Sequence, residues 1–99
     1  IGMIDLFEFD PKNKRIGVGL LILEKFQNQG FGSQTLKLII EYSFSTLNVR
    51  QIFANISSNN EKSISLFKKF NFVEVGVKKD WNFNNNTFHD EILFQLMNA

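Results

Sequence analysis

The chain has 99 residues, a length that suits one domain at most, with 43% hydrophobic and 21% charged residues. This balance is typical of a globular protein and excludes a disordered one. The net charge of +1 argues against non-specific nucleic-acid binding, which needs a concentrated basic surface. The absence of cysteine excludes a disulfide framework, a thiolate metal site and a cysteine nucleophile.

The sequence predicts no membrane partner and a cytoplasmic location. No apolar run approaches about 18 residues, and no signal peptide is visible. The chain starts at Ile1 and enters a strand-like run almost at once, whereas a natural chain starts with Met and usually a few loose residues. This start indicates a fragment of a longer chain or the removal of a leader.

A β-hairpin is predicted at the start of the chain. Residues 3–9 are rich in β-branched and aromatic types, residues 10–14 have the Pro and Asn of a turn, and residues 15–23 form a second β-rich run. On one face of that second run lie Gly17 and Gly19, which weaken a strand and expose its backbone. This face indicates either the close approach of a ligand or another backbone, or simply a bulge or tight packing.

Helices and strands alternate through the rest of the chain. Apolar side chains recur at helical spacing over residues 32–47, and a short strand follows at 51–57. Ser58 and Glu61 have the spacing of a capping box, which predicts a second helix ending near Phe70. Asn71 suits the left-handed position that closes such a helix.

Two final strands are predicted at 72–79 and 88–97, joined by a loop at 82–87 that turns at residues 84–86. The order is therefore β-β-α-β-α-β-β. This order predicts an α/β (α+β) fold, with a mixed sheet and helices on its faces.

A polar loop that closes with Gly30 and Gly32 leads into the first predicted helix. Free backbone N–H groups and the positive end of the helix dipole make such a start an anion site, suited to a pyrophosphate. The Walker phosphate loop needs a Gly-Lys pair that the chain lacks, and the dinucleotide fingerprint needs a third glycine. A Gly-x-Gly pattern by itself is equally compatible with a simple tight turn.

The motif Gln27-Asn28-Gln29-Gly30-Phe31-Gly32 resembles the Q/R-x-x-G-x-G/A loop of the Gcn5-related N-acetyltransferase (GNAT) family, whose amides hold the coenzyme A pyrophosphate. Residues 60–72 look like the family's second signature: an Asn opening a helix, an aromatic residue seven positions on, and a G-F-like pair. Residues 41–48 are similar to the branch of spermidine and ribosomal-protein N-terminal acetyltransferases. The resemblance implies that residues 1–99 are the C-terminal, acetyl-CoA-binding part of a single GNAT domain whose N-terminal part is absent.

The resemblance also implies a site for acetyl-CoA as cosubstrate, without a metal. The second strand would lie along the pantetheine arm, the loop around the pyrophosphate, and the second helix beside the pantetheine and adenosine. The implied contacts are Leu20, Leu21, Ile22, Gln27, Asn28, Gln29, Gly30, Phe31, Gly32, Ser33, Asn60, Ser63, Phe67 and Lys69. Lys62 and Lys68 could also approach phosphates, although lysines on a helix are more often a solvated face. His89, the only histidine, is more often a surface residue than a catalyst or ligand.

Acetyl transfer needs a neutral amine in line with the thioester carbon, a stabilised oxyanion and a protonated leaving thiolate. The family's usual strand carboxylate falls on Gly17 here, so the general base is unknown; Asp5, Glu8 and Asp10 are nearby but are more often simply solvated. The family's usual tyrosine acid falls on Phe67, which has no proton to give. Phe67 could instead be only a core aromatic.

The sequence therefore predicts an N-acetyltransferase that moves acetyl from acetyl-CoA to a polyamine, another small amine or a protein N-terminal amine. The alternative is a catalytically weak coenzyme A binding module with a regulatory role. A polyamine could be attracted by the acidic residues Glu8, Asp10, Asp90 and Glu91. An unpaired strand edge left by the missing N-terminal part could be covered by a second copy of the chain, giving a homodimer. No nucleic-acid partner is expected.

Overall fold

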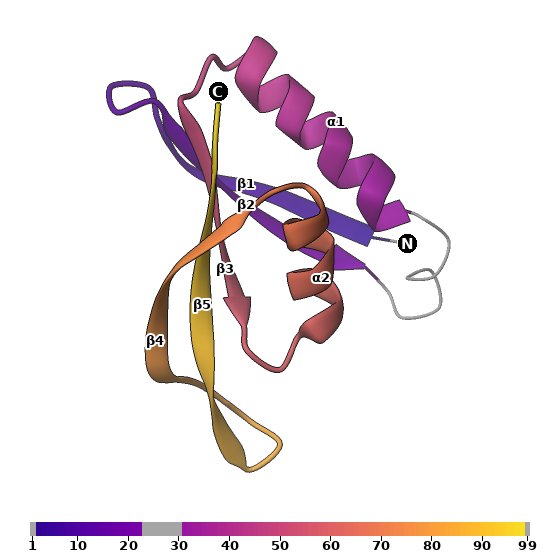
Figure 1. Cartoon of the computed structure of the whole chain (residues 1–99), viewed down its shortest axis with the longest axis vertical. Helices are drawn as coiled ribbons and strands as arrows, with labels where there is room; N and C mark the ends of the chain where they lie inside the picture. The colour runs from indigo at the N-terminus through magenta and orange to yellow at the C-terminus, as the bar shows by residue number, and fades with distance from the viewer. Residues whose placement is uncertain (1, 23–30, 99) are drawn as a thin grey trace. The chain divides into compact units, whose positions relative to one another are not determined.

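The structure, a computed structural model, describes residues 2–22 and 31–98. Its elements are β1 (Gly2–Asp10), β2 (Arg15–Ile22), α1 (Phe31–Ser45), β3 (Gln51–Ser57), α2 (Glu61–Lys69), β4 (Val73–Asn84) and β5 (Thr87–Met97) (Figure 1). The predicted element order is confirmed. The strands form a five-stranded sheet in the order β1-β2-β3-β5-β4, so the predicted fold class is also confirmed. The chain divides into two compact units: unit 1 comprises residues 1–52 and 97–99, and unit 2 comprises residues 53–96.

Unit 1 is built on the antiparallel β1–β2 hairpin, with α1 lying against β2. Ile16 and Val18 are buried, as the alternation of apolar residues along β2 predicts. Leu36 on α1 and Ile52 at the start of β3 are fully buried as well. These side chains form the apolar core of unit 1, and their burial accounts for much of its stability.

Gly17 makes room for an aromatic ring. It stands opposite Phe7 in the β1–β2 register, and a Cβ added to Gly17 would lie 2.6 Å from Phe7 Cζ. Real Cβ atoms essentially never come that close, so a larger residue at position 17 would force the Phe7 ring to move. Of the two interpretations of the glycine-bearing face, tight packing is therefore the one the structure shows at Gly17.

Helix α1 is shorter at its end than the predicted range of 32–47. The N–H groups of Thr46 and Leu47 both donate to Tyr42 O, at 2.8 and 3.2 Å, so the regular hydrogen-bond pattern of the helix ends at this carbonyl. Asn48 then adopts a left-handed conformation with φ of 55°, and the Val49 N–H donates to Ser43 O. Apolar periodicity continued past the point where the backbone leaves the helix, which is why the prediction ran two residues too far.

In unit 2, the N-cap of α2 is Asn60, so the predicted Ser58 capping box is wrong. The Asn60 side chain accepts a hydrogen bond from the Ser63 N–H at 3.2 Å. The Ser58 N–H instead donates to Asp90 O at 2.7 Å, a contact with β5. Asn is as good an N-cap as Ser, and a tertiary hydrogen bond decides between the two.

The C-terminal end of α2 is a Schellman motif. Asn71 is left-handed with φ of 70°, as predicted, the Phe72 N–H donates to Phe67 O at 3.1 Å, and the Asn71 N–H donates to Lys68 O at 3.0 Å. The rings of Phe67 and Phe72 meet edge to face with centroids 4.9 Å apart. This is the apolar contact that accompanies the motif, and both rings are buried.

The β4–β5 hairpin is longer than predicted, because its turn needs only two residues. Asn85 and Asn86 both have positive φ, at 50° and 61°, as a type I′ turn requires. Asn84 and Thr87, which the sequence places in a loop at 82–87, are paired strand residues. The register shifts twice along this hairpin, between Glu74 and Gly76 and between Lys78 and Asn82.

Candidate functional site

The predicted pyrophosphate loop is framed by two elements of unit 1. β2 ends at Ile22 and α1 begins at Phe31. Residues 20–22 are held by β1 through the pairs Ile4↔Leu20, Met3↔Leu21 and Gly2↔Ile22. The predicted contacts Gln27, Asn28, Gln29 and Gly30 lie outside the described residues. The motif requires a strand before the loop and a helix after it, and the structure has both.

The N-terminus of α1 has the electrostatic character of an anion site. Phe31, Gly32 and Ser33 form its first turn, at the positive end of the helix dipole. No acidic side chain lies in that turn. Gly32 is buried, and the absence of a Cβ there leaves the backbone free to approach a ligand closely. The turn therefore fits a phosphate group.

The N-terminus of α2 differs in this respect. Glu61 places a carboxylate in its first turn, and the Asn60 side chain caps the Ser63 N–H. Both groups already satisfy the positive end of the helix dipole. Asn60 and Ser63, two of the residues predicted to contact coenzyme A, are thus brought together, and they serve the helix itself.

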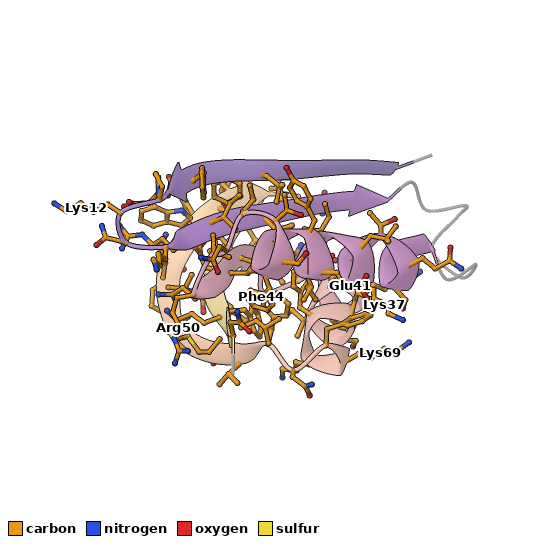
Figure 2. The ribbon with its side chains drawn as sticks, turned by 90° about the horizontal axis from the view of Figure 1, so that it is seen from above. Lys12, Lys37, Glu41, Phe44, Arg50 and Lys69 are labelled. Carbon is orange, nitrogen blue, oxygen red and sulfur yellow. The ribbon has the colours of Figure 1, made fainter. Side chains whose placement is uncertain are left out.

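Phe67 and Lys69, the other two predicted contacts on α2, have different surroundings. Phe67 is 2% exposed and belongs to the core of unit 2. Lys69 is exposed, as are Lys62 and Lys68 (Figure 2). Lys68 and Lys69 lie in the last turn, where cations are favourable beside the negative end of the dipole. Lys68 and Lys69 are therefore matched to the helix dipole, whereas Lys62 lies in the first turn, at the opposite end of α2.

Among the candidate bases, Asp10 is engaged in the hairpin turn. Its Oδ1 accepts the Asn13 N–H at 3.0 Å, its Oδ2 accepts Asn13 Nδ2 at 2.8 Å, and Arg15 lies 3.5 Å away. The backbone hydrogen bond from Asn13 is the main reason that the pKa of Asp10 lies below its ordinary value. A carboxylate whose charged form is stabilised in this way is a weak proton acceptor.

Three of the four acidic residues suggested to attract a polyamine already have cationic partners. Asp10 pairs with Arg15, Asp90 with Lys79 at 3.4 Å, and Glu91 with Lys78 at 3.7 Å. The pKa of Asp90 is lowered, chiefly because its carboxylate accepts the Asp80 N–H at 3.0 Å. Glu8, the fourth, is exposed at the β1 bulge with φ of 50°.

Two buried polar atoms lie outside the site that the sequence predicted. His89 is half-buried rather than on the surface, and its Nε2 has no hydrogen-bond partner among the described residues. Ser43 is fully buried on α1, and its Oγ also lacks a partner there. The apolar spacing of the α1 stripe placed Ser43 on the core side, but nothing in the sequence marked His89. Within residues 2–22 and 31–98, no three metal-ligating side chains gather.

The acetyltransferase (GNAT) domain family matches residues 1–73, well over half of the chain. The chain therefore belongs to the GNAT acetyltransferase family. This match includes the β1–β2 hairpin, the Gly-rich loop, α1, β3 and α2, and it confirms the family that the sequence motifs indicated.

Curated relatives are named N-acetyltransferases. The chain is 28% identical over 96 residues to the SPbeta prophage-derived uncharacterized N-acetyltransferase YokL of Bacillus subtilis, covering 97% of this chain and 54% of YokL. It is 27% identical to the putative ribosomal N-acetyltransferase YdaF of the same organism (97% and 52% covered) and to the spermidine N(1)-acetyltransferase of Vibrio cholerae (91% and 52%). The chain thus spans about half the length of these relatives.

Solved structures show the same fold. A probable acetyltransferase superposes with a TM-score of 0.90 at 27% identity, over 97% of this chain and 54% of its own. A spermidine/spermine N-acetyltransferase from Vibrio cholerae, solved with manganese ions, superposes with a TM-score of 0.88 at 25% identity, over 98% of this chain and 57% of its own.

Among the described residues, neither α1 nor α2 is long and apolar enough to cross a membrane.

Proposed function

We propose that the protein containing this chain transfers an acetyl group from acetyl-CoA to an amine. The observation that carries the proposal is the GNAT family match over a strand–loop–helix unit in which β2 and α1 frame the Gly-rich loop. Residues 1–99 would supply the coenzyme A binding part of a single GNAT domain, and the other half of the catalytic domain would come from sequence outside them.

The cosubstrate would be held mainly by backbone groups. The first turn of α1, from Phe31 to Ser33, contains no carboxylate that would compete with a phosphate for the positive end of the helix dipole. Residues 20–22 would lie beside the pantetheine arm, and the loop before α1 would surround the pyrophosphate. This arrangement fits acetyl-CoA, whose phosphates match the anion site, and it needs no metal.

The chemistry would depend on positioning more than on proton transfer by side chains. Asp10 is committed to the turn, and Gly17 offers no carboxylate where the family usually has one. Phe67 cannot protonate the leaving thiolate. A coenzyme A thiol resembles a free cysteine, with a pKa of about 8.5, so its thiolate can leave unprotonated near neutral pH.

The acceptor proposed is a small amine, including a polyamine, or a protein N-terminal amine. The relatives named for spermidine and for ribosomal targets support this range. The ion pairs of Asp10, Asp90 and Glu91 argue that these residues do not provide the attraction for a polycation. Acceptor recognition would then depend on groups elsewhere in the intact protein.

The test is a coupled free-thiol assay on the intact protein with a panel of polyamines, simple amines and peptides. Release of free coenzyme A that depends on an amine supports the proposal. Binding of coenzyme A without turnover of any amine would favour the alternative, a catalytically weak binding module, to which the departures at Gly17 and Phe67 point.

The binding half of the proposal is tested separately with Gly30→Val, which should block close approach of the loop backbone and abolish acetyl-CoA binding in calorimetry. Gly76→Val is the matched control, because a Cβ at Gly76 meets nothing within 4 Å. Equal affinity in Gly30→Val and the parent would contradict a pyrophosphate site at this loop.

A further inference from the structure

One end of unit 1 carries a local excess of positive charge. The β1–β2 turn carries Lys12, Lys14 and Arg15, and Arg50 lies beside it, against a single carboxylate in the turn, Asp10. We call these five residues the turn patch. Its charge of +3 exceeds the +1 of the whole chain, so all the other residues together are net negative. Even with Glu8 included, two positions before the turn, two positive charges remain.

Backbone hydrogen bonds hold the turn patch together. Lys14 O accepts the N–H groups of both Arg50 and Gln51, at 2.6 and 3.2 Å, which fastens the turn to the start of β3. The Arg50 guanidinium donates to Asn98 O at 2.6 Å, and the side chains of the four cationic residues are exposed. Lys12 and Arg50 lie toward the same end of unit 1, away from Lys37 (Figure 2).

The turn patch is separate from the predicted acetyl-CoA loop. β2 begins in the patch at Arg15 and reaches the loop only after Ile22. At about 3.3 Å per residue, the two ends of this strand are roughly 23 Å apart. The patch is therefore too far from the loop to contact a pyrophosphate bound there.

An exposed aromatic side chain adjoins the turn patch. Phe9 is 46% exposed at the β1 bulge, directly before Asp10. Cationic side chains that reach phosphates, next to an aromatic face on which a base stacks, are the combination that binds single-stranded nucleic acid. An acidic peptide would use the same cations, and would use the ring only through an apolar side chain of its own.

We propose that the turn patch, with Phe9, binds the phosphate backbone of a single-stranded nucleic acid. Arg15 is paired with Asp10, which leaves three cations for phosphates: Lys12, Lys14 and Arg50. Three contacts to a single strand give a slope of about −2 for log affinity against log salt. The net charge of the chain predicts no such partner; the inference comes from how the charge is distributed, and it is independent of the acetyltransferase proposal.

The experiment measures fluorescence anisotropy of a labelled short oligouridylate with the intact protein. At about 0.1 M salt each lost phosphate contact weakens binding about fivefold, so Lys12→Gln/Lys14→Gln should weaken it about 25-fold and Lys12→Gln alone about fivefold. The control Lys37→Gln/Lys62→Gln removes the same charge from the two helices and should leave binding within twofold. Phe9→Ser should weaken oligouridylate binding but not binding of polyglutamate.

The remaining outcomes overturn the proposal. Equal affinity of parent and Lys12→Gln/Lys14→Gln would exclude the turn patch as the binding surface. Tighter binding of polyglutamate than of oligouridylate, unaffected by Phe9→Ser, would assign the patch to an acidic protein partner. Loss of oligonucleotide binding in Gly30→Val would place the oligonucleotide at the Gly-rich loop instead.

Discussion

Replacement of Phe67 by Tyr distinguishes a catalytic position from a packing position. Phe67 stands where the family usually has a tyrosine acid, so a site role predicts that the added hydroxyl raises kcat. General acid catalysis is typically worth about 10²–10⁴-fold, which is the range available. A packing role predicts no gain in turnover and a loss of stability.

The structure favours the packing role. The ring is 2% exposed, meets Phe72 edge to face and forms the apolar contact of the Schellman motif that ends α2. A hydroxyl buried there without a partner destabilises by about 1–3 kcal/mol. We therefore expect Phe67→Tyr to lower the free energy of unfolding by that amount and to leave kcat within a factor of a few.

The measurement is urea unfolding and acetyl-CoA turnover of the same Phe67→Tyr preparation of the intact protein. Phe70→Tyr is the matched control: it adds the same hydroxyl to the half-buried residue that follows α2, and should change stability by less. A rise in kcat of a hundredfold or more with unchanged stability would refute the packing argument and identify the hydroxyl as a restored acid.

Three further substitutions test individual contacts. Asn60→Ala should destabilise by about 0.5–2 kcal/mol in urea unfolding, because it removes the cap on the Ser63 N–H, while Asn60→Ser should preserve most of the stability; equal loss in both would argue against capping. Asp10→Asn should lower the Tm at pH 7. Because folding lowers the pKa of Asp10, its contribution to stability is fully present above the ordinary pKa of 3.8 and disappears as the pH falls through the folded pKa. The Tm difference between the parent and Asp10→Asn should therefore shrink in acid. A Tm difference that stays constant with pH would contradict the lowered pKa. Gly17→Glu should not restore a base but destabilise by about 1–3 kcal/mol, since Phe7 occupies the space, and Phe7→Ala in the same chain should relieve part of that loss; full stability of Gly17→Glu alone would disprove the clash.

The sequence by itself determined the features that depend on neighbouring residues. β3 begins and ends where predicted, at Gln51–Ser57, since apolar alternation and flanking turns define a short strand. Asn71 adopts the predicted left-handed closure because its short amide tolerates positive φ and the helix periodicity ends just before it. The motif of the family loop could be recognised for the same reason, since its two glycines are only two positions apart in the chain.

Only the tertiary structure decided the features that join distant residues. The bond from the Ser58 N–H to Asp90 O selects Asn60 as the cap, although Ser58 has the better local motif. Register across the β1–β2 hairpin puts the Phe7 ring over Gly17. The bond from the Arg50 N–H to Lys14 O gathers a basic patch that a net charge of +1 conceals. Composition sums charges over the whole chain, whereas a binding surface depends on which of them folding brings together.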